Sequence, residues 1–184
     1  FTTNQGFVDL VPNDCEFFNI TSPVGHFQND EFAYVIPSGA TSFNGDMQQD
    51  KKIVVSALSD AAFPITIGDL VVVTLNNDTS SKHVSTVKSL TGTNLQPRVI
   101  TLFDAPDFAQ GDSTVQVSIQ LGVGGKVTYF NKSNPDTLHI KESTVKQSAQ
   151  YTTDGTQVIT GATSGATANV ASIFNAPVSY VQPF

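Results

Sequence analysis

The sequence predicts an all-β protein built from small antiparallel β-barrel or β-sandwich modules. Valine and threonine each occur 21 times in 184 residues, against 9 leucines and 3 glutamates. Side chains that are β-branched or aromatic favour strands, whereas Leu and Glu favour helices. The 13 glycines and 9 prolines supply turns. Short strand-like runs recur along the chain, and no ten-residue stretch has the 3.6-residue period of a helix.

The first group of predicted strands lies in the middle of the chain. The run 70–75 is apolar at consecutive positions, as expected for a strand buried on both faces. The run 114–120 alternates apolar and polar residues, as expected for a half-buried strand. The other runs in this group are 53–56, 84–88 and 99–103, with a polar loop at 76–81 and a turn at 91–94.

Two further strand pairs are predicted after the glycine-rich segment 121–125, which we expect to be a sharp bend or a boundary. The first pair is 126–130 with 137–141, joined by a turn at 131–135. The second pair is 157–160 with 168–173, joined by the small-residue segment 161–167.

These runs suggest three regions. Residues 1–50 are irregular and predict an N-terminal arm or edge strands, residues 51–122 a first β module, and residues 123–184 a second β module. We also expect the chain to be a domain, a fragment or a processed product of a longer chain. The expected core consists of Ile53, Val55, Val71, Val73, Leu75, Ile100, Leu102, Val115, Val117, Ile119, Val127, Tyr129, Ile140 and Ile159.

The charge balance argues against several partners. Sixteen acidic and nine basic residues give a net charge of −7, and Arg98 is the sole arginine. Nucleic acids and anionic membranes reward clustered Lys and Arg, so neither is expected as a partner. No apolar run approaches the ~20 residues of a membrane-spanning helix. Cys15 is the single cysteine, so no disulfide within the chain is expected.

Two glycine-rich segments resemble catalytic motifs but depart from them. Ser164 lies in the segment 161–165, where position 162 is alanine and a strand-like run follows instead of the helix of a nucleophile elbow. Lys126 follows the glycines of 122–125, but residue 120 is glutamine and residue 127 is valine, so the phosphate-loop spacing is not met. We therefore expect tight turns at both places, no bound nucleotide and no cofactor.

Histidines and carboxylates give no metal or acid–base pattern. His26, His83 and His139 are far apart in the sequence, with no second histidine at a ligand spacing. The cluster Asp104, Asp107 and Asp112 lacks the spacing of an EF-hand and is more typical of solvated turns. A pair of glycosidase carboxylates from distant strands stays open, because such pairs have no fixed spacing.

Two segments resemble phrases in virion proteins of tailed bacteriophages, especially baseplate, tail and fibre proteins of contractile-tailed phages. The first is Gly125-Lys-Val-Thr-Tyr-Phe-Asn131 followed by Thr137-Leu-His-Ile140. The second is Val158-Ile-Thr-Gly-Ala-Thr-Ser-Gly-Ala-Thr-Ala-Asn-Val170. The likeness covers roughly the last third of the chain. It implies a structural module located in a virion, usually oligomeric and without catalytic activity.

The sequence thus predicts a structural or assembly protein of a phage tail, baseplate or fibre, which is not an enzyme and binds other virion proteins and copies of itself. Its neutral polar residues would form contacts that resist changes in salt. The expected contact residues are aromatic, with ordinary core as the alternative for the N-terminal phenylalanines: Phe7, Phe17, Phe18, Phe27, Phe32, Tyr180 and Phe184.

A carbohydrate-binding or host-adhesion module is the main alternative. Exposed aromatic rings and Asn, Asp and Gln side chains would bind a glycan, although tryptophan, the best stacking surface, is absent. A hydrolase is a third and weaker alternative, because no nucleophile, acid–base pair or metal set is evident.

Overall fold

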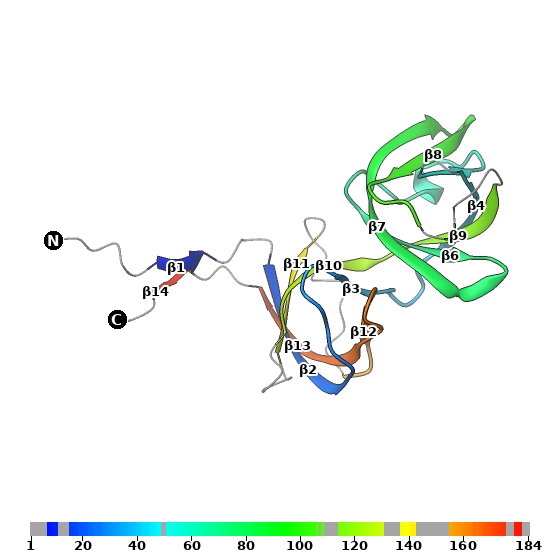
Figure 1. The fold of residues 1–184 in the computed structure, drawn as a ribbon. Helices are drawn as coiled ribbons and strands as arrows, with labels where there is room; N and C mark the ends of the chain where they lie inside the picture. The colour runs from blue at the N-terminus through cyan, green and yellow to red at the C-terminus, as the bar shows by residue number, and fades with distance from the viewer. Residues whose placement is uncertain are drawn as a thin grey trace. The chain divides into compact units, whose positions relative to one another are not determined.

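The chain is all-β, as predicted, and forms two closed antiparallel barrels of six strands each (Figure 1). The structure is a computed structural model and describes residues 7–10, 15–48, 51–106, 108, 114–130, 137–142, 155–175 and 179–181. A single 3-10 turn, η1, covers Asp60–Ala62. No described helix is long and apolar enough to cross a membrane.

Barrel 1 takes its strands from both ends of the chain, in the spatial order β10-β11-β2-β13-β12-β3. β2 pairs with β11 on one side and with β13 on the other, and β13 pairs with β12. The strands are β2 (Cys15–Val24), β3 (Phe32–Val35), β10 (Val123–Phe130), β11 (Thr137–Glu142), β12 (Val158–Gly161) and β13 (Thr167–Asn175).

Barrel 2 takes its strands from the middle of the chain, in the order β4-β5-β8-β7-β6-β9. The long strand β7 pairs with β6 through its first half and with β8 through its second half, which helps to curve the sheet into a barrel. The strands are β4 (Ser42–Met47), β5 (Lys52–Val55), β6 (Leu70–Leu75), β7 (Asp78–Thr93), β8 (Gln96–Leu102) and β9 (Val115–Leu121).

A separate two-stranded ladder joins the beginning and the end of the chain. It consists of β1 (Phe7–Leu10) and β14 (Ser179–Val181), which run antiparallel. Phe7 is opposite Val181 and Leu10 is opposite Ser179 in the register.

Most predicted strands are present within a residue or two of their expected bounds. The run 70–75 is β6, and the pairs 126–130 with 137–141 and 157–160 with 168–173 are the neighbours β10 with β11 and β12 with β13. The predicted loop 76–81 is shorter, because β7 begins at Asp78. The carboxylate of Asp78 accepts hydrogen bonds from the Ser80 and Ser81 hydroxyls, which hold this turn at the start of the strand.

The division of the chain differs from the prediction chiefly at residue 50, whereas the boundary predicted at 122 lies three residues from the observed one at 125. The two compact units are 1–33 with 126–184, and 34–125. Within the predicted arm 1–50, β2 and β3 belong to barrel 1 and β4 belongs to barrel 2. The physical reason is that β2 pairs with β11 and β13. These strands are more than 100 residues away, and local sequence patterns do not report such pairing.

The core agrees with the expected set at most positions. Two of the predicted residues, Leu75 and Val115, are only partly buried against the core of barrel 2. Tyr129 is the exception at 45% exposed, because the inward–outward alternation of β10 stops after Val127 and both Thr128 and Tyr129 are exposed. The remaining predicted core residues are buried: Ile53, Val55, Val71, Val73, Ile100, Leu102, Val117, Ile119, Val127, Ile140 and Ile159.

The predicted boundary near residue 122 coincides with the passage from β9 to β10. Gly122 separates these strands, and a Cβ at this position would lie 2.5 Å from Cδ2 of Leu70. A residue with a side chain at position 122 would therefore require the buried Leu70 side chain to move.

Candidate functional site

Barrel 1 contains a buried carboxylate that accepts four hydrogen bonds. Glu31 follows the loop after β2 and is 5% exposed. The backbone N–H groups of Thr163 and Ser164 donate to its Oε2 at 2.9 and 2.8 Å. The Gln28 N–H and the Ser164 hydroxyl donate to Oε1, each at 2.7 Å. Three of these hydrogen bonds tie the loop between β12 and β13 to the start of β3, and the fourth, from Gln28, is local.

The environment of Glu31 favours its ionised form. Burial acts to raise the pKa of this carboxyl, but the hydrogen bonds from Ser164, Gln28 and Thr163 lower it below its ordinary value of 4.5. Gly161 leaves the space that this arrangement needs, because a Cβ there would lie 2.6 Å from Oε1 of Glu31. The carboxylate therefore holds a loop in place, and its oxygens are occupied by protein donors.

The same arrangement explains Ser164, the residue in the segment that resembles a nucleophile elbow. Its hydroxyl donates to Glu31 and accepts the N–H of Ala166 at 3.1 Å. A catalytic serine needs a hydroxyl that reaches substrate, whereas the hydroxyl of Ser164 and the carboxylate that it bonds are both engaged by backbone N–H groups of the protein. The bonds of Ser164 are those of a structural turn.

Lys126 and Phe32, both in barrel 1, contact each other. The Lys126 Nζ lies 4.0 Å from the centroid of the Phe32 ring, a close cation–π contact. The glycines that precede this lysine at 122, 124 and 125 are buried within or next to β10. In place of a phosphate loop, the structure has a strand whose lysine packs on an aromatic ring.

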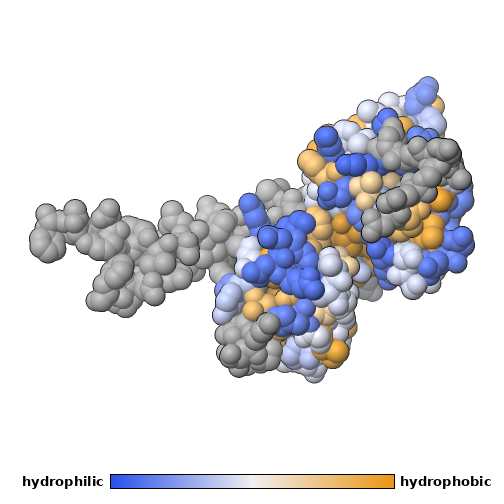
Figure 2. Space-filling model, viewed as in Figure 1, coloured by the Kyte–Doolittle hydropathy of each residue, from blue (hydrophilic) through white to orange (hydrophobic). Residues whose placement is uncertain are grey.

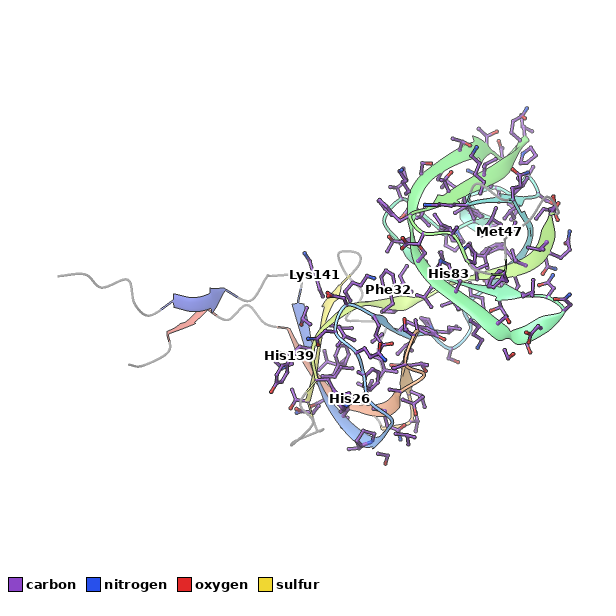
Figure 3. All side chains as sticks on the ribbon, in the orientation of Figure 1. His26, Phe32, Met47, His83, His139 and Lys141 are labelled. Atoms are coloured by element: carbon purple, nitrogen blue, oxygen red, sulfur yellow. The ribbon has the colours of Figure 1, made fainter. Side chains whose placement is uncertain are left out.

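The three histidines have separate environments, with His26 and His139 in barrel 1 and His83 in barrel 2 (Figure 3). The His26 ring is 4.7 Å from that of Phe130, and the His83 Nε2 is 3.2 Å from the Asp104 carbonyl oxygen. Burial lowers the pKa of His139 to about 4, so this ring is neutral at pH 7. Among the described residues, no group of three His, Cys, Asp or Glu side chains could hold a metal ion.

The acidic cluster is described only in part. Asp104 lies after β8, and its N–H donates to the Ser85 hydroxyl at 3.2 Å. Asp107 and Asp112 lie outside the described residues.

The predicted contact residues fall into three groups: buried, half-buried, and those whose side chains lie outside the described residues. Phe18 and Phe27 are 0% and 2% exposed, so they are core residues of barrel 1, which corrects the prediction that they contact a partner. Phe32 is half-buried beneath Lys126. The backbones of Phe7, Phe17 and Tyr180 lie in β1, β2 and β14, but their side chains, and all of Phe184, lie outside the described residues.

An aromatic pair lies on the outside of barrel 1. The ring of Tyr129, 45% exposed, packs on the ring of His139 with centroids 4.9 Å apart. The two residues are on the neighbouring strands β10 and β11, and the Thr128 hydroxyl donates to the His139 carbonyl oxygen at 3.3 Å. This pair offers an accessible aromatic surface.

Arg98 in barrel 2 was missed as a structural residue at the sequence level. It is 6% exposed, and its Nη1 and Nη2 donate to the carbonyl oxygens of Gly92 and Leu58 at 3.2 and 2.8 Å. Its guanidinium also lies 5.3 Å from the centroid of the Phe63 ring. A sole arginine in an alternating strand is a weak signal, and no local pattern identifies the carbonyls that it bonds.

Comparison of the chain with protein-family models, with curated proteins and with solved structures finds no match.

Proposed function

We propose that this chain is a structural or assembly protein of a bacteriophage virion, in the tail, the baseplate or a fibre. It acts through contacts with copies of itself and with other virion proteins, and not as an enzyme. The proposal rests on the likeness to tailed-phage virion proteins. The phrases that carry this likeness, 125–131 with 137–140 and 158–170, fall on β10, β11, β12 and β13 of one barrel.

The chemistry of the candidate residues supports a structural role. Glu31 and Ser164 bond each other and the loop between β12 and β13. Arg98 bonds two backbone carbonyls, and Lys126 packs on Phe32. Each of these groups, which could otherwise act on a substrate, is engaged in contacts within its own barrel.

Fractionation of virus particles tests the proposal. Particles from the source of this sequence are purified on a density gradient, and each fraction is analysed by peptide mass spectrometry. Peptides of this chain should sediment with intact particles and remain with them after a high-salt wash. Peptides confined to particle-free fractions would contradict the proposal.

A glycan-binding or host-adhesion module is the second candidate, and the exposed Tyr129–His139 pair is the observation that favours it. Aromatic rings bind the apolar face of a sugar, and the neutral ring of His139 adds to that surface. A glycan array with the native chain and a Tyr129→Ala variant separates the two functions. Binding that is lost in the variant supports adhesion, and no binding by either removes it.

A further inference from the structure

Three neighbouring strands of barrel 1 come from stretches of sequence without charge. The residues 155–184 contain no Asp, Glu, Lys or Arg, and neither do the residues 17–29, although the whole chain has 9 + 16 = 25 such residues. These stretches contain β12, β13 and β2 from residue 17 onward. The pairing of β2 with β13 and of β13 with β12 brings the two stretches into one sheet.

The register defines an outer face on these strands. Val24 is opposite Thr167, which is opposite Thr160, and Thr21 is opposite Asn169, which is opposite Val158. Directly opposed residues share one side of a sheet. The neighbours Ile20, Ala168, Val170 and Ile159 are buried on the other side. We call the outward set the uncharged face: Thr21, Val24, Val158, Thr160, Thr167 and Asn169.

The uncharged face combines exposed aliphatic groups with neutral polar ones. Val24 and Val158 are 67% and 45% exposed. Beside them, the Asn19 amide donates to the Ser172 hydroxyl at 2.8 Å across β2 and β13. Figure 2 shows pale and orange residues at the lower right of barrel 1, in the region that β2 and β12 occupy in Figure 1. Barrel 2 differs, because charged residues such as Asp78, Lys82 and Lys88 are exposed along β7.

We propose that the uncharged face is the surface through which one copy of this chain binds a second copy. This inference rests on the proposed structural function and names the contact surface. Interface centres are depleted of Lys, Glu and Asp, because burying an unpaired charge costs more free energy than burying a hydrogen-bonded neutral group. Solvated sheet faces, by contrast, are usually kept apart by charged side chains.

The choice of a second copy follows from charge. At a net charge of −7, two copies repel each other. A two-fold contact places the same patch on both sides, so a patch with charges of one sign opposes itself. A face without charge avoids that repulsion. A different partner would more commonly be selected by charges of opposite sign, which this face lacks.

The area of the uncharged face sets the expected affinity of the dimer. The eight residues of β2 from Phe17 onward, the nine of β13 and the four of β12, at about 3.3 Å per residue on strands about 4.8 Å apart, cover roughly 300 Å². A stable interface takes about 800 Å² from each partner, so the isolated dimer should be weak, with a Kd on the order of 100 µM.

Sedimentation velocity of the full chain, from about 10 µM to about 1 mM, tests the proposal. The native chain should shift from monomer to dimer in this range. Val158→Asp should weaken the association at least about tenfold, because it places two carboxylates in the interface. Val24→Asp repeats the test from another strand if Val158→Asp does not fold, and Val158→Thr should keep the dimer. Leu95→Asp is the matched control, since it adds the same charge at an 83% exposed residue of barrel 2.

A native chain that stays monomeric throughout would overturn the uncharged face as a dimer contact. So would a dimer that both aspartate variants leave intact, or one that Leu95→Asp weakens equally. These results are separate from the particle fractionation. A chain present in particles but insensitive to Val158→Asp keeps the proposed function and loses this contact, whereas absence from particles removes the function itself.

Discussion

The two barrels each bury one charged side chain among the described residues, and they use it in opposite ways. Barrel 1 buries an anion, Glu31, which accepts backbone N–H groups of the loop between β12 and β13. Barrel 2 buries a cation, Arg98, which donates to backbone carbonyls in the β5–β6 connection and near the end of β7. In both, a single ion bonds backbone groups from two separate segments of the chain.

The distance spanned along the sequence differs between the two ions. Arg98 bonds residues 6 and 40 positions away, whereas Glu31 bonds Ser164 at a separation of 133. Barrel 2 is therefore completed within one continuous stretch, and barrel 1 needs the two ends of the chain to meet. Contacts between distant residues form slowly because the loop must first close. We infer that barrel 1 depends more on its buried ion than barrel 2 does.

Replacement of Glu31 should have the largest effect. In Glu31→Gln, an amide NH₂ faces N–H donors, so the free energy of unfolding of barrel 1 should fall by about 3 kcal/mol. Hydrogen exchange should show faster exchange in peptides of β12 and β13 than in peptides of β5 and β6. Thr163→Ala is the control, because its N–H remains and its exposed side chain does not bond Glu31. Equal acceleration in both barrels would contradict this account.

Replacement of Arg98 should act on barrel 2 by a smaller amount. Arg98→Met keeps much of the apolar stem but removes the donors that bond the carbonyls of Leu58 and Gly92. The free energy of unfolding of barrel 2 should therefore fall by about 2 kcal/mol. The same exchange experiment should now show the change in β5 and β8. Lys88→Met, at an exposed lysine, is the control and should change little. Faster exchange confined to β12 and β13 would refute the assignment.

The pH dependence of barrel 1 gives a third comparison. Burial lowers the pKa of His139 from 6.5 to about 4, so the unfolded chain binds a proton that the folded chain does not. The stability contributed by neutral His139 is complete above pH 6.5 and falls as the pH drops toward 4. The difference between the pKa of His139 in the unfolded and the folded chain corresponds to at most about 3 kcal/mol in the free energy of unfolding. Because His139 is partly exposed, we expect about 1–2 kcal/mol.

Urea unfolding between pH 7 and 5 measures this slope. The window lies above 4.5, the ordinary pKa of the Glu31 carboxyl, so the lowered pKa of this group contributes little. His139→Gln should flatten the slope for barrel 1. An unchanged slope in the variant would show that another group causes the pH dependence.

The aromatic pair should have the smallest effect on stability. Tyr129→Ala removes a half-exposed ring that packs on the ring of His139. The free energy of unfolding should fall by about 0.5–1 kcal/mol. Thermal unfolding measures the change, and Tyr129→Phe should retain most of the stability. A loss as large as that of Glu31→Gln would mean that Tyr129 belongs to the core after all.

Local sequence patterns predicted much of the fold for a physical reason. The consecutive apolar residues of β6, the period-two alternation of β9 and the β-branched residues of β12 are properties of neighbouring residues, so they report strands and buried positions such as Val71 and Ile159. Turn residues likewise placed the two strand pairs of barrel 1.

What the sequence could not reveal depends on distant partners. Nothing near Glu31 indicates that residues 163 and 164 will donate to it, and nothing in β2 indicates pairing with β11 and β13. Phe18 and Phe27 were expected to bind partners, but the closed barrel places both inside. The uncharged face was visible in the sequence only as two separate runs, and the strand register joins them.

The central claim is that the uncharged face of barrel 1 is a contact surface and that the described part of barrel 2 has none of this kind. Hydroxyl-radical footprinting tests this claim most directly, because it reports the solvent access of individual side chains. The free chain at low concentration is compared with the chain in purified particles. We predict that oxidation of Val24 and Val158 falls severalfold in the particle, while that of Ile67 and Leu95, equally apolar and exposed on barrel 2, changes less. Unchanged oxidation of Val24 and Val158 beside protected Ile67 and Leu95 would contradict the account and assign the contact surface to barrel 2.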